Sequence, residues 1–202
     1  FRVESEVWKP HGLASVAVTG GPAIPIGPRD GHVWAFAFSP DGATIAALVS
    51  DTEDLAATWD NVRLVVTAID GSGERELLRL SGFPGALVAN GRHVAVVGSR
   101  VPDIDPTNVF VVDVSSGEVT VLDDRGMTPT VVAFEGDDLL VHAVETQRSR
   151  IDRVDPHGAE WEQVSLGGEL DDAWVDPRVG WDVRAGRIAV AGAFADHPAN
   201  IY

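Results

Sequence analysis

The sequence of 202 residues contains no cysteine and only one lysine, Lys9. The absence of cysteine excludes disulfide bonds, zinc–thiolate sites and thiol catalysis, and it agrees with a reducing cytoplasm. No stretch approaches the ~20 apolar residues that a membrane-spanning helix needs, and no basic and apolar signal segment is visible at the N-terminus. We therefore expect a cytoplasmic protein that makes no membrane contact.

Basic residues are scarce as a group: 15 Lys and Arg stand against 31 Asp and Glu, which gives a formal net charge of −16. Because nucleic-acid affinity comes mainly from Lys and Arg contacts with phosphates, this balance argues against a nucleic-acid partner. A solvated acidic surface explains the charge better than salt adaptation or a cationic partner does. With 45% hydrophobic and 23% charged residues, the composition is that of a folded domain with a sizeable core.

Glycine-containing turns recur along the chain in two interleaved sets, and each turn lies between short runs of β-type residues. The glycines of the first set are spaced by 49, 45 and 50 residues, and those of the second set by 51, 46 and 41. Asn-Gly and Asp-Gly favour tight hairpins because both central positions of the turn need positive φ. The first set is Asp41-Gly42, Asn90-Gly91, Glu135-Gly136 and Ala185-Gly186, and the second is Gly20-Gly21, Asp70-Gly71, Ser116-Gly117 and His157-Gly158.

The runs between the turns are rich in β-branched and aromatic residues and show no sustained 3.6-residue period, which favours strands over helices. Four short strands in each unit of 41 to 51 residues are typical of a β-propeller blade. An immunoglobulin-like sandwich also has short strands, but it does not repeat its turn chemistry at such an interval. The sequence therefore predicts an all-β protein, a β-propeller fragment of about three complete four-stranded blades and two partial blades.

The repeat divides the chain into five segments. The predicted boundaries are 1–32 for the end of one blade, 33–82, 83–126 and 127–168 for three blades, and 169–202 for the start of a truncated blade. In the first segment, 15–18 and 23–26 read as the last two strands of a blade. In the last segment, strands are expected over 174–182, over 187–194 and from Asn200 onward. Because the chain stops inside a strand, we expect it to be a piece of a larger ring whose remaining blades cover its apolar faces.

Two segments carry a family resemblance. The run Phe36-Ala37-Phe38-Ser39-Pro40-Asp41-Gly42 resembles the Ser-Pro-Asp-Gly blade motif of TolB-like propellers and of the propellers of prolyl oligopeptidase family serine peptidases. The segment from Ala193 to Tyr202 is similar to the Pro-containing loop and Ile-Tyr strand near the close of the propeller in acylaminoacyl-peptidase-like members. The resemblance covers the whole chain at the level of blades, although the later turns keep only the glycine of the motif.

The resemblance implies a serine peptidase in which a propeller of TolB-like or WD-like repeats accompanies an α/β-hydrolase domain with a Ser-Asp-His triad. In such an enzyme the propeller is not catalytic: it covers the active site, admits only short peptides and helps to hold their N-terminal end. No serine of this chain has glycine two residues before and two residues after it, and Gly71-Ser72-Gly73 lies in an expected hairpin turn. We therefore assign no catalytic, cofactor-binding or metal-binding residue and expect no cofactor.

The six histidines form no His-x-His or His-Glu-x-x-His pair, so the sequence indicates no metal site of that kind. His93 and His142 lie in strand runs and are interpreted as hydrogen-bonded structural residues. Two acidic clusters contain oxygen ligands suited to calcium, but neither continues into a calcium-binding loop, and solvated loops explain them better. These clusters are Asp51 with Glu53 and Asp54, and Asp103 with Asp105, while the doublets Asp123-Asp124, Asp137-Asp138 and Asp171-Asp172 fall at expected turns.

Six tryptophans raise the question of sugar stacking. Trp34 and Trp161 lie on expected strands, and Trp174 and Trp181 flank one. Packing between blades explains these four residues better than ligand contact does. Trp59, in a long acidic loop, is the tryptophan we would test for binding. A propeller glycosidase would need two carboxylates about 5–10 Å apart, and it ranks below two other functions.

Two functions from different classes remain. The first is the non-catalytic propeller portion of a serine peptidase, which gates the access of short peptides to a hydrolase domain absent from this chain. Its partners would be the remaining blades, that hydrolase domain and short peptide substrates, with oligomerisation left open. The second is a stand-alone TolB-like or WD-type propeller that acts as a protein-binding scaffold. A Gly-x-Ser-x-Gly hydrolase region in the intact protein would distinguish the first from the second.

Overall fold

The computed structural model is built from β-strands throughout the part of the chain that it describes. The described residues are 11–52, 61–82, 85–99, 108–122, 128–145, 148–158, 160–167, 174–175, 181–194 and 197–201. Within these ranges no helix is present, and none of the described residues therefore forms a helix that could span a membrane. The strands pair as one short hairpin and four larger antiparallel sheets.

Each of the first three large sheets contains four strands that pair in chain order. The first sheet comprises β3 (His32–Phe38), β4 (Thr44–Ser50), β5 (Val62–Ala68) and β6 (Arg75–Leu80). The second comprises β7 (Leu87–Ala89), β8 (His93–Gly98), β9 (Asn108–Asp113) and β10 (Val119–Leu122). The third comprises β11 (Thr128–Glu135), β12 (Asp138–Glu145), β13 (Arg148–Val154) and β14 (Trp161–Val164).

The Ser-Pro-Asp-Gly turn shows why these hairpins form where the sequence predicts them. Ser39 Oγ accepts a hydrogen bond from the backbone N–H of Thr44 at 3.0 Å, and Asp41 Oδ1 accepts one from the N–H of Ala43 at 3.0 Å. Gly42 has a φ of 69°, which a residue with a Cβ adopts only at a cost. Side chains of the turn therefore satisfy backbone donors that the end of the ladder leaves unpaired.

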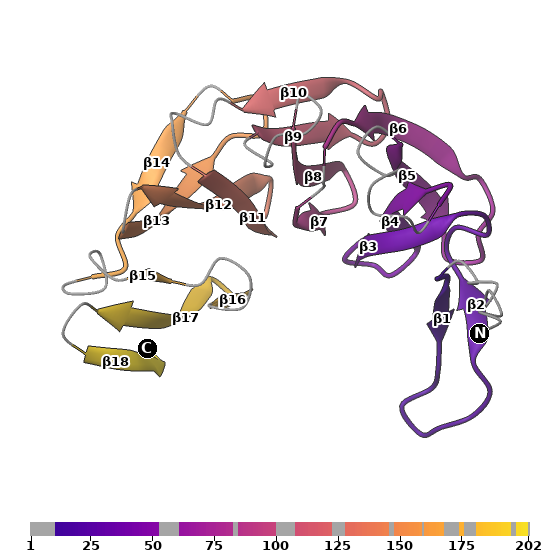
Figure 1. The fold of residues 1–202 in the computed structure, drawn as a ribbon, viewed down its shortest axis with the longest axis horizontal. Coiled ribbons are helices and arrows are strands. Elements are labelled where there is room, and N and C mark those ends of the chain that lie inside the picture. Colours follow the sequence, from indigo (N-terminus) through magenta and orange to yellow (C-terminus); the bar gives the residue numbers. More distant parts are fainter. Residues whose placement is uncertain are drawn as a thin grey trace, which may run out of the picture.

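The fourth sheet contains β15 (Trp174–Val175), β16 (Trp181–Arg184), β17 (Arg187–Phe194) and β18 (His197–Ile201). Gly192 of β17 pairs with Val175 on one edge and with Asn200 on the other, so β15 and β18 lie on opposite edges of β17. β16 follows β15 along the same edge (Figure 1). β15 and β16 therefore lie on one edge of β17, and β18 lies on the other. Where one strand was expected over 174–182, the structure has two short strands, β15 and β16. The last strand, β18, begins at His197 rather than at Asn200.

The N-terminal hairpin contains β1 (Leu13–Ser15) and β2 (Ile24–Ile26). The expectation of a strand over 15–18 was wrong, because the side chains of Val16 and Val18 are 55% and 107% exposed beyond the end of β1. Leu13 pairs with Ile26 in the ladder, and both pack on a buried cluster of the first sheet that contains Ile45. Burial of this pair against the first sheet accounts for the register of the hairpin. The alternation of residues 15–18 does not determine that register.

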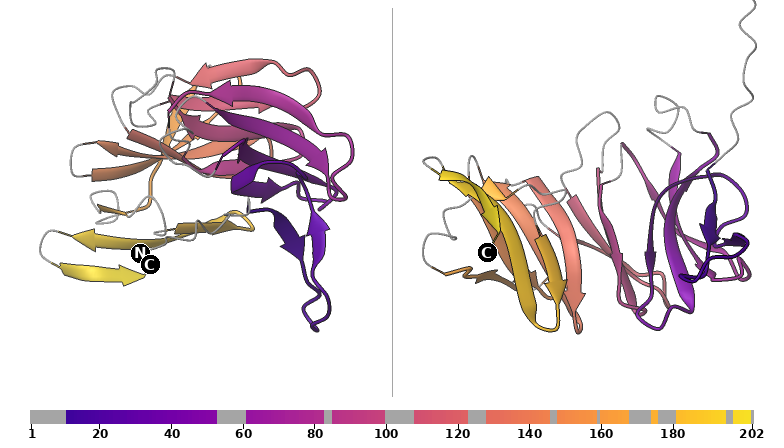
Figure 2. Two further views of the ribbon diagram at one scale, coloured as in Figure 1. Left: turned by 45° about the vertical axis from the view of Figure 1, so that its right-hand side comes forward. Right: turned by 90° about the horizontal axis from the view of Figure 1, so that it is seen from below.

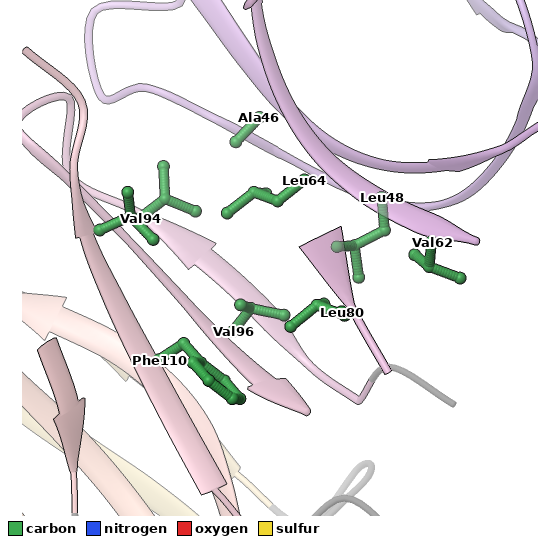
Figure 3. Close-up of a cluster of buried hydrophobic side chains, with 9 residues drawn as sticks. Ala46, Leu48, Val62, Leu64, Leu80, Val94, Val96 and Phe110 are labelled. Carbon is green, nitrogen blue, oxygen red and sulfur yellow. The ribbon is translucent and has the colours of Figure 1, made fainter. Parts of the chain in front are cut away.

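The sheets pack face to face through buried apolar clusters. The cluster between the first and second sheets includes Leu64 and Leu80 from one sheet and Val96 and Phe110 from the other (Figure 3). A second cluster joins the second sheet to the third and includes Val111, Leu122, Leu139 and Val154. Successive residues of β9 serve opposite neighbours, since Val112 belongs to the first cluster and Val111 to the second. This two-residue period makes the second sheet the middle layer of a stack.

The sheets follow one another around an arc, with β3, β7 and β11 toward its inner side and β6, β10 and β14 toward its outer side (Figure 1). Figure 2 shows the same succession from two further directions, with the N-terminal hairpin at one end of the arc and the fourth sheet at the other. The sheets do not close into a ring. This arrangement confirms the predicted fold class, an all-β portion of a β-propeller.

Candidate functional site

Turns of the first predicted set stack on one another between consecutive sheets. A Cβ placed on Gly91 would lie 3.8 Å from Pro40 Cδ and 3.9 Å from Ser39 Cβ, which belong to the Ser-Pro-Asp-Gly turn of the preceding sheet. Asn90 Nδ2 donates a hydrogen bond of 3.2 Å to the carbonyl of Gly136 in the following sheet. The sequence period of these turns is therefore also a spatial period.

The second set of turns makes a parallel row of contacts. Arg29, which follows the N-terminal hairpin, donates a hydrogen bond of 2.8 Å from Nη2 to the carbonyl of Asp70 in the first sheet. Arg75 of the first sheet donates one of 3.5 Å from Nη1 to the carbonyl of Ser115 in the second. A Cβ on Gly158 of the third sheet would lie 3.2 Å from Leu122 Cδ2 of the second. The last three turns of this set therefore each contact the unit that precedes them, whereas a Cβ on Gly20 or Gly21 would meet no atom within 4 Å.

An open hollow of about 480 Å³ lies where the first strands of three consecutive sheets meet. Its lining comes from β3, β7 and β11 and from the turns that follow them. The lining residues are Ala37, Phe38, Pro40, Leu87, Val88, Ala89, Asn90, Ala133, Phe134 and Gly136. We call this space the axial hollow, because these strands lie toward the inner side of the arc (Figure 1).

The chemistry of the axial hollow favours an apolar group. The lining residues carry no charged side chain, and the amide of Asn90 is already engaged. Asn90 Oδ1 accepts hydrogen bonds from the backbone N–H groups of Arg92 at 3.0 Å and His93 at 2.7 Å. Phe38 is 42% exposed and meets the ring of Phe36 edge to face, with ring centroids 5.7 Å apart. A ligand here gains more from apolar contact than from hydrogen bonding to side chains.

A smaller cavity of about 110 Å³ lies at the contact between the second and third sheets. Asp113 lines it, and hydrogen bonds donated by Ser115 and Ser116 hold the pKa of this carboxyl far below its usual value. His93 also lines it and is 3% exposed, and burial lowers the pKa of its imidazole. The contact between His93 and His157 could not be predicted from the sequence, since it depends on how two blades pack.

The structure tests the roles that were predicted for the histidines and tryptophans. Trp34 and Trp161 pack against the clusters between sheets, which confirms that interpretation. His93 and His142 lie in strands, as expected, and both are buried. The hydrogen-bonded role was wrong for one atom of His93, because its Nδ1 has no hydrogen-bond partner among the described residues. Trp59 lies outside the described residues.

Acidic and serine candidates remain peripheral in the part of the chain that the structure describes. Asp51 is exposed and pairs with Arg63 at 3.0 Å. Ser72 sits in the hairpin turn expected for it, where its N–H donates to Asp70 Oδ1. Among the described residues no group of three His, Asp or Glu side chains is arranged to hold a metal ion. The candidates outside the described residues are Glu53, Asp54, Asp103, Asp105, Asp123-Asp124 and Asp171-Asp172.

Comparison with solved structures identifies the class of fold. TolB from Agrobacterium tumefaciens matches 92% of this chain with a TM-score of 0.60 and 16% identity, and the chain spans 64% of that structure. TolB from Acinetobacter baumannii matches 94% with a TM-score of 0.60 and 13% identity, over 48% of its length. The chain therefore has the fold of a TolB-like β-propeller and spans less than two thirds of these relatives.

The same fold occurs in enzymes. A puromycin-hydrolyzing peptidase from Mycobacterium tuberculosis matches 89% of this chain with a TM-score of 0.59 and 15% identity, and the chain spans 28% of it. Prolyl endopeptidases and an oligogalacturonate lyase in complex with manganese are also among the matched structures. No family model and no curated protein matches the chain. At these identities the likeness establishes the fold alone.

Proposed function

We propose that this chain is a portion of the propeller of a serine peptidase, and that its axial hollow admits short peptides to a hydrolase domain outside the chain. One observation supports the proposal most: three consecutive first strands line a single open hollow of about 480 Å³ without a charged side chain. Pockets of about 300–1,000 Å³ suit small ligands. A folded domain of 100 residues, with a radius of gyration of about 13 Å, is too large to enter a hollow of this volume.

The matched peptidases support the same proposal. This chain spans only 28% of the puromycin-hydrolyzing peptidase and 24% of a prolyl endopeptidase, so most of each of those proteins lies outside the matched region. The remaining blades and a hydrolase domain are the partners that such an architecture requires. Acylaminoacyl-type specificity and a cytoplasmic location belong to the proposal and rest on the sequence.

The test uses the intact protein, a serine-reactive inhibitor and peptides of increasing length. Phe38→Ala widens the axial hollow at a side chain that is 42% exposed, so the fold loses little packing. Val119→Ala removes an exposed apolar side chain from β10, on the outer side of the arc, and serves as the matched control. We expect Phe38→Ala to raise kcat/KM for the longest peptides and to leave dipeptide cleavage unchanged. We expect Val119→Ala to change kcat/KM for neither kind of peptide. Absence of inhibitor-sensitive peptidase activity, or an equal effect of both variants, would contradict the proposal.

A protein-binding scaffold is the second candidate, and the likeness to two TolB structures favours it. Those structures are the ones of which this chain spans 64% and 48%, larger shares than it spans of the peptidases. A scaffold would lack the serine nucleophile, so the intact protein would not react with a serine-directed inhibitor. Mass spectrometry of the intact protein after exposure to such an inhibitor separates the two candidates by the presence or absence of a covalent adduct.

A further inference from the structure

His93 is a buried imidazole that lies across the contact between the second and third sheets. It starts β8 and is 3% exposed. Its ring stacks on Phe134 of β11, with centroids 6.3 Å apart and planes 25° from parallel. The ring of His157, in the turn that follows β13, meets it edge to face with centroids 6.2 Å apart. One side chain of the second sheet is therefore held between two rings of the third.

The charged groups around His93 come from every element that faces it. Asp113 Oδ2 of β9 lies 3.8 Å from His93 Nε2 and 3.6 Å from Nε of Arg92, so two cations would share this one carboxylate oxygen. The other oxygen of Asp113 is already occupied by hydrogen bonds from the turn at 115–116. Glu118 and His157 also line the small cavity.

The site holds the neutral form of the His93 imidazole. Burial is the main cause that lowers the pKa of His93, and the charges of Arg92 and His157 add to it. The carboxylates of Asp113 and Asp137 oppose the shift without reversing it. The Nδ1 atom finds no hydrogen-bond partner among the described residues, so a proton there would be buried and unpaired.

The direction of the pH effect follows from linkage. An open interface exposes His93 to water, where its pKa returns toward about 6.5. Between that value and the lowered pKa of the closed interface, the open form binds more protons. The closed contact is therefore at full strength above about pH 6.5 and weakens as the pH falls below it.

We propose that His93 makes the contact between the second and third sheets proton-sensitive, so that this interface opens selectively at mildly acidic pH. In acid the His93 imidazolium and Arg92 would face each other across the small cavity and share Asp113 Oδ2. Phe134 stacks on His93 and also lines the axial hollow, so opening would disturb one wall of that hollow.

The absence of cysteine allows a direct test by thiol labelling of the full chain. Val111→Cys places a thiol in the cluster between the second and third sheets. Val112→Cys places one on the opposite face of the same strand, in the cluster between the first and second sheets, and is the matched control. At each pH the labelling rate of the first is divided by that of the second, which cancels the pH dependence of the thiol itself. We expect this ratio to rise up to about tenfold between pH 7.5 and pH 5.5.

Two histidine variants make the cause identifiable. His93→Gln keeps a donor near Asp113 but cannot be protonated, so the ratio should stay constant across this pH range. His157→Gln changes an exposed side chain, which the fold tolerates, and should leave most of the rise in place, because the charge of His157 is a smaller cause of the lowered pKa of His93 than burial is. A ratio that does not change with pH in the parent chain would overturn the proposal. A rise that survives in His93→Gln would do the same.

Discussion

Gly71 offers a sharp test of how the N-terminal hairpin sits against the first sheet. A Cβ on Gly71 would lie 2.6 Å from the carbonyl oxygen of Gly27 and 2.9 Å from Nε of Arg29. The Gly27 backbone cannot retreat freely, because its N–H donates a hydrogen bond of 3.0 Å to the carbonyl of Ile69. Gly73 lies in the same turn with a similar φ, 66° against 80°, and a Cβ there would meet no atom within 4 Å. The two glycines therefore differ in contact and hardly in conformation.

The expected losses follow from this difference. Placing alanine in the left-handed region costs about 1–2 kcal/mol at either position. Reduced freedom of the unfolded chain returns about 0.4–1 kcal/mol to both variants. Only Gly71→Ala adds the strain of overpacking, which costs about 1–3 kcal/mol. We therefore expect Gly71→Ala to lower the free energy of unfolding by about 1–3 kcal/mol more than Gly73→Ala does.

The assay is urea denaturation of the full chain, followed by tryptophan fluorescence and analysed at constant m-value. If Gly71→Ala and Gly73→Ala lose the same stability, the hairpin does not sit against the turn at 70–73. That result would refute the packing described here at one end of the arc, whatever the size of the common loss.

Three further changes test the core, a buried ion pair and the acid response. Leu64→Ala removes a fully buried side chain between the first and second sheets and should cost about 3–5 kcal/mol in denaturant unfolding. Asp152 is 0% exposed and pairs with Arg150, so Asp152→Ala should cost about 3–5 kcal/mol by the same assay, whereas a loss below about 1 kcal/mol would show the pair to be solvated. The lowered pKa of Asp113 implies stabilisation that is present above about pH 4 and is lost as the pH falls further. Asp113→Asn should therefore reduce the urea midpoint at pH 7 and bring it closer to that of the parent chain in strong acid, and a gap that does not narrow would contradict this assignment.

The turns and the blade repeat could be predicted from sequence because their causes are local. Asp41-Gly42 and Asn90-Gly91 combine a side chain that accepts backbone hydrogen bonds with a glycine that adopts positive φ. Strand alternation then identifies the faces that pack, as Val111 and Val112 show. The all-β propeller fold follows from these two signals and their common period. The five predicted segment boundaries stay a prediction.

What could not be predicted depends on contacts between blades. The hairpin register is set by Leu13 and Ile26 lying against the first sheet, whereas the alternation of 15–18 pointed to the wrong residues. The axial hollow needs three strands that lie about 40–50 residues apart in the sequence. The meeting of His93 with His157 likewise has no local cause, because it joins the start of one blade to a late turn of the next.

The most direct test of the central claim, that consecutive sheets stack as propeller blades, is a disulfide across the stacked turns. Ser39 Cβ and a Cβ on Gly91 lie 3.9 Å apart, within the range of about 3.5–4.5 Å that a disulfide needs. Gly117 also has positive φ but would meet no atom within 4 Å, so it gives the matched control. Under mild oxidation we expect Ser39→Cys with Gly91→Cys to form an intramolecular disulfide and Ser39→Cys with Gly117→Cys to remain reduced. Equal oxidation of the two pairs, or preference for the second, would contradict the stacked-blade arrangement.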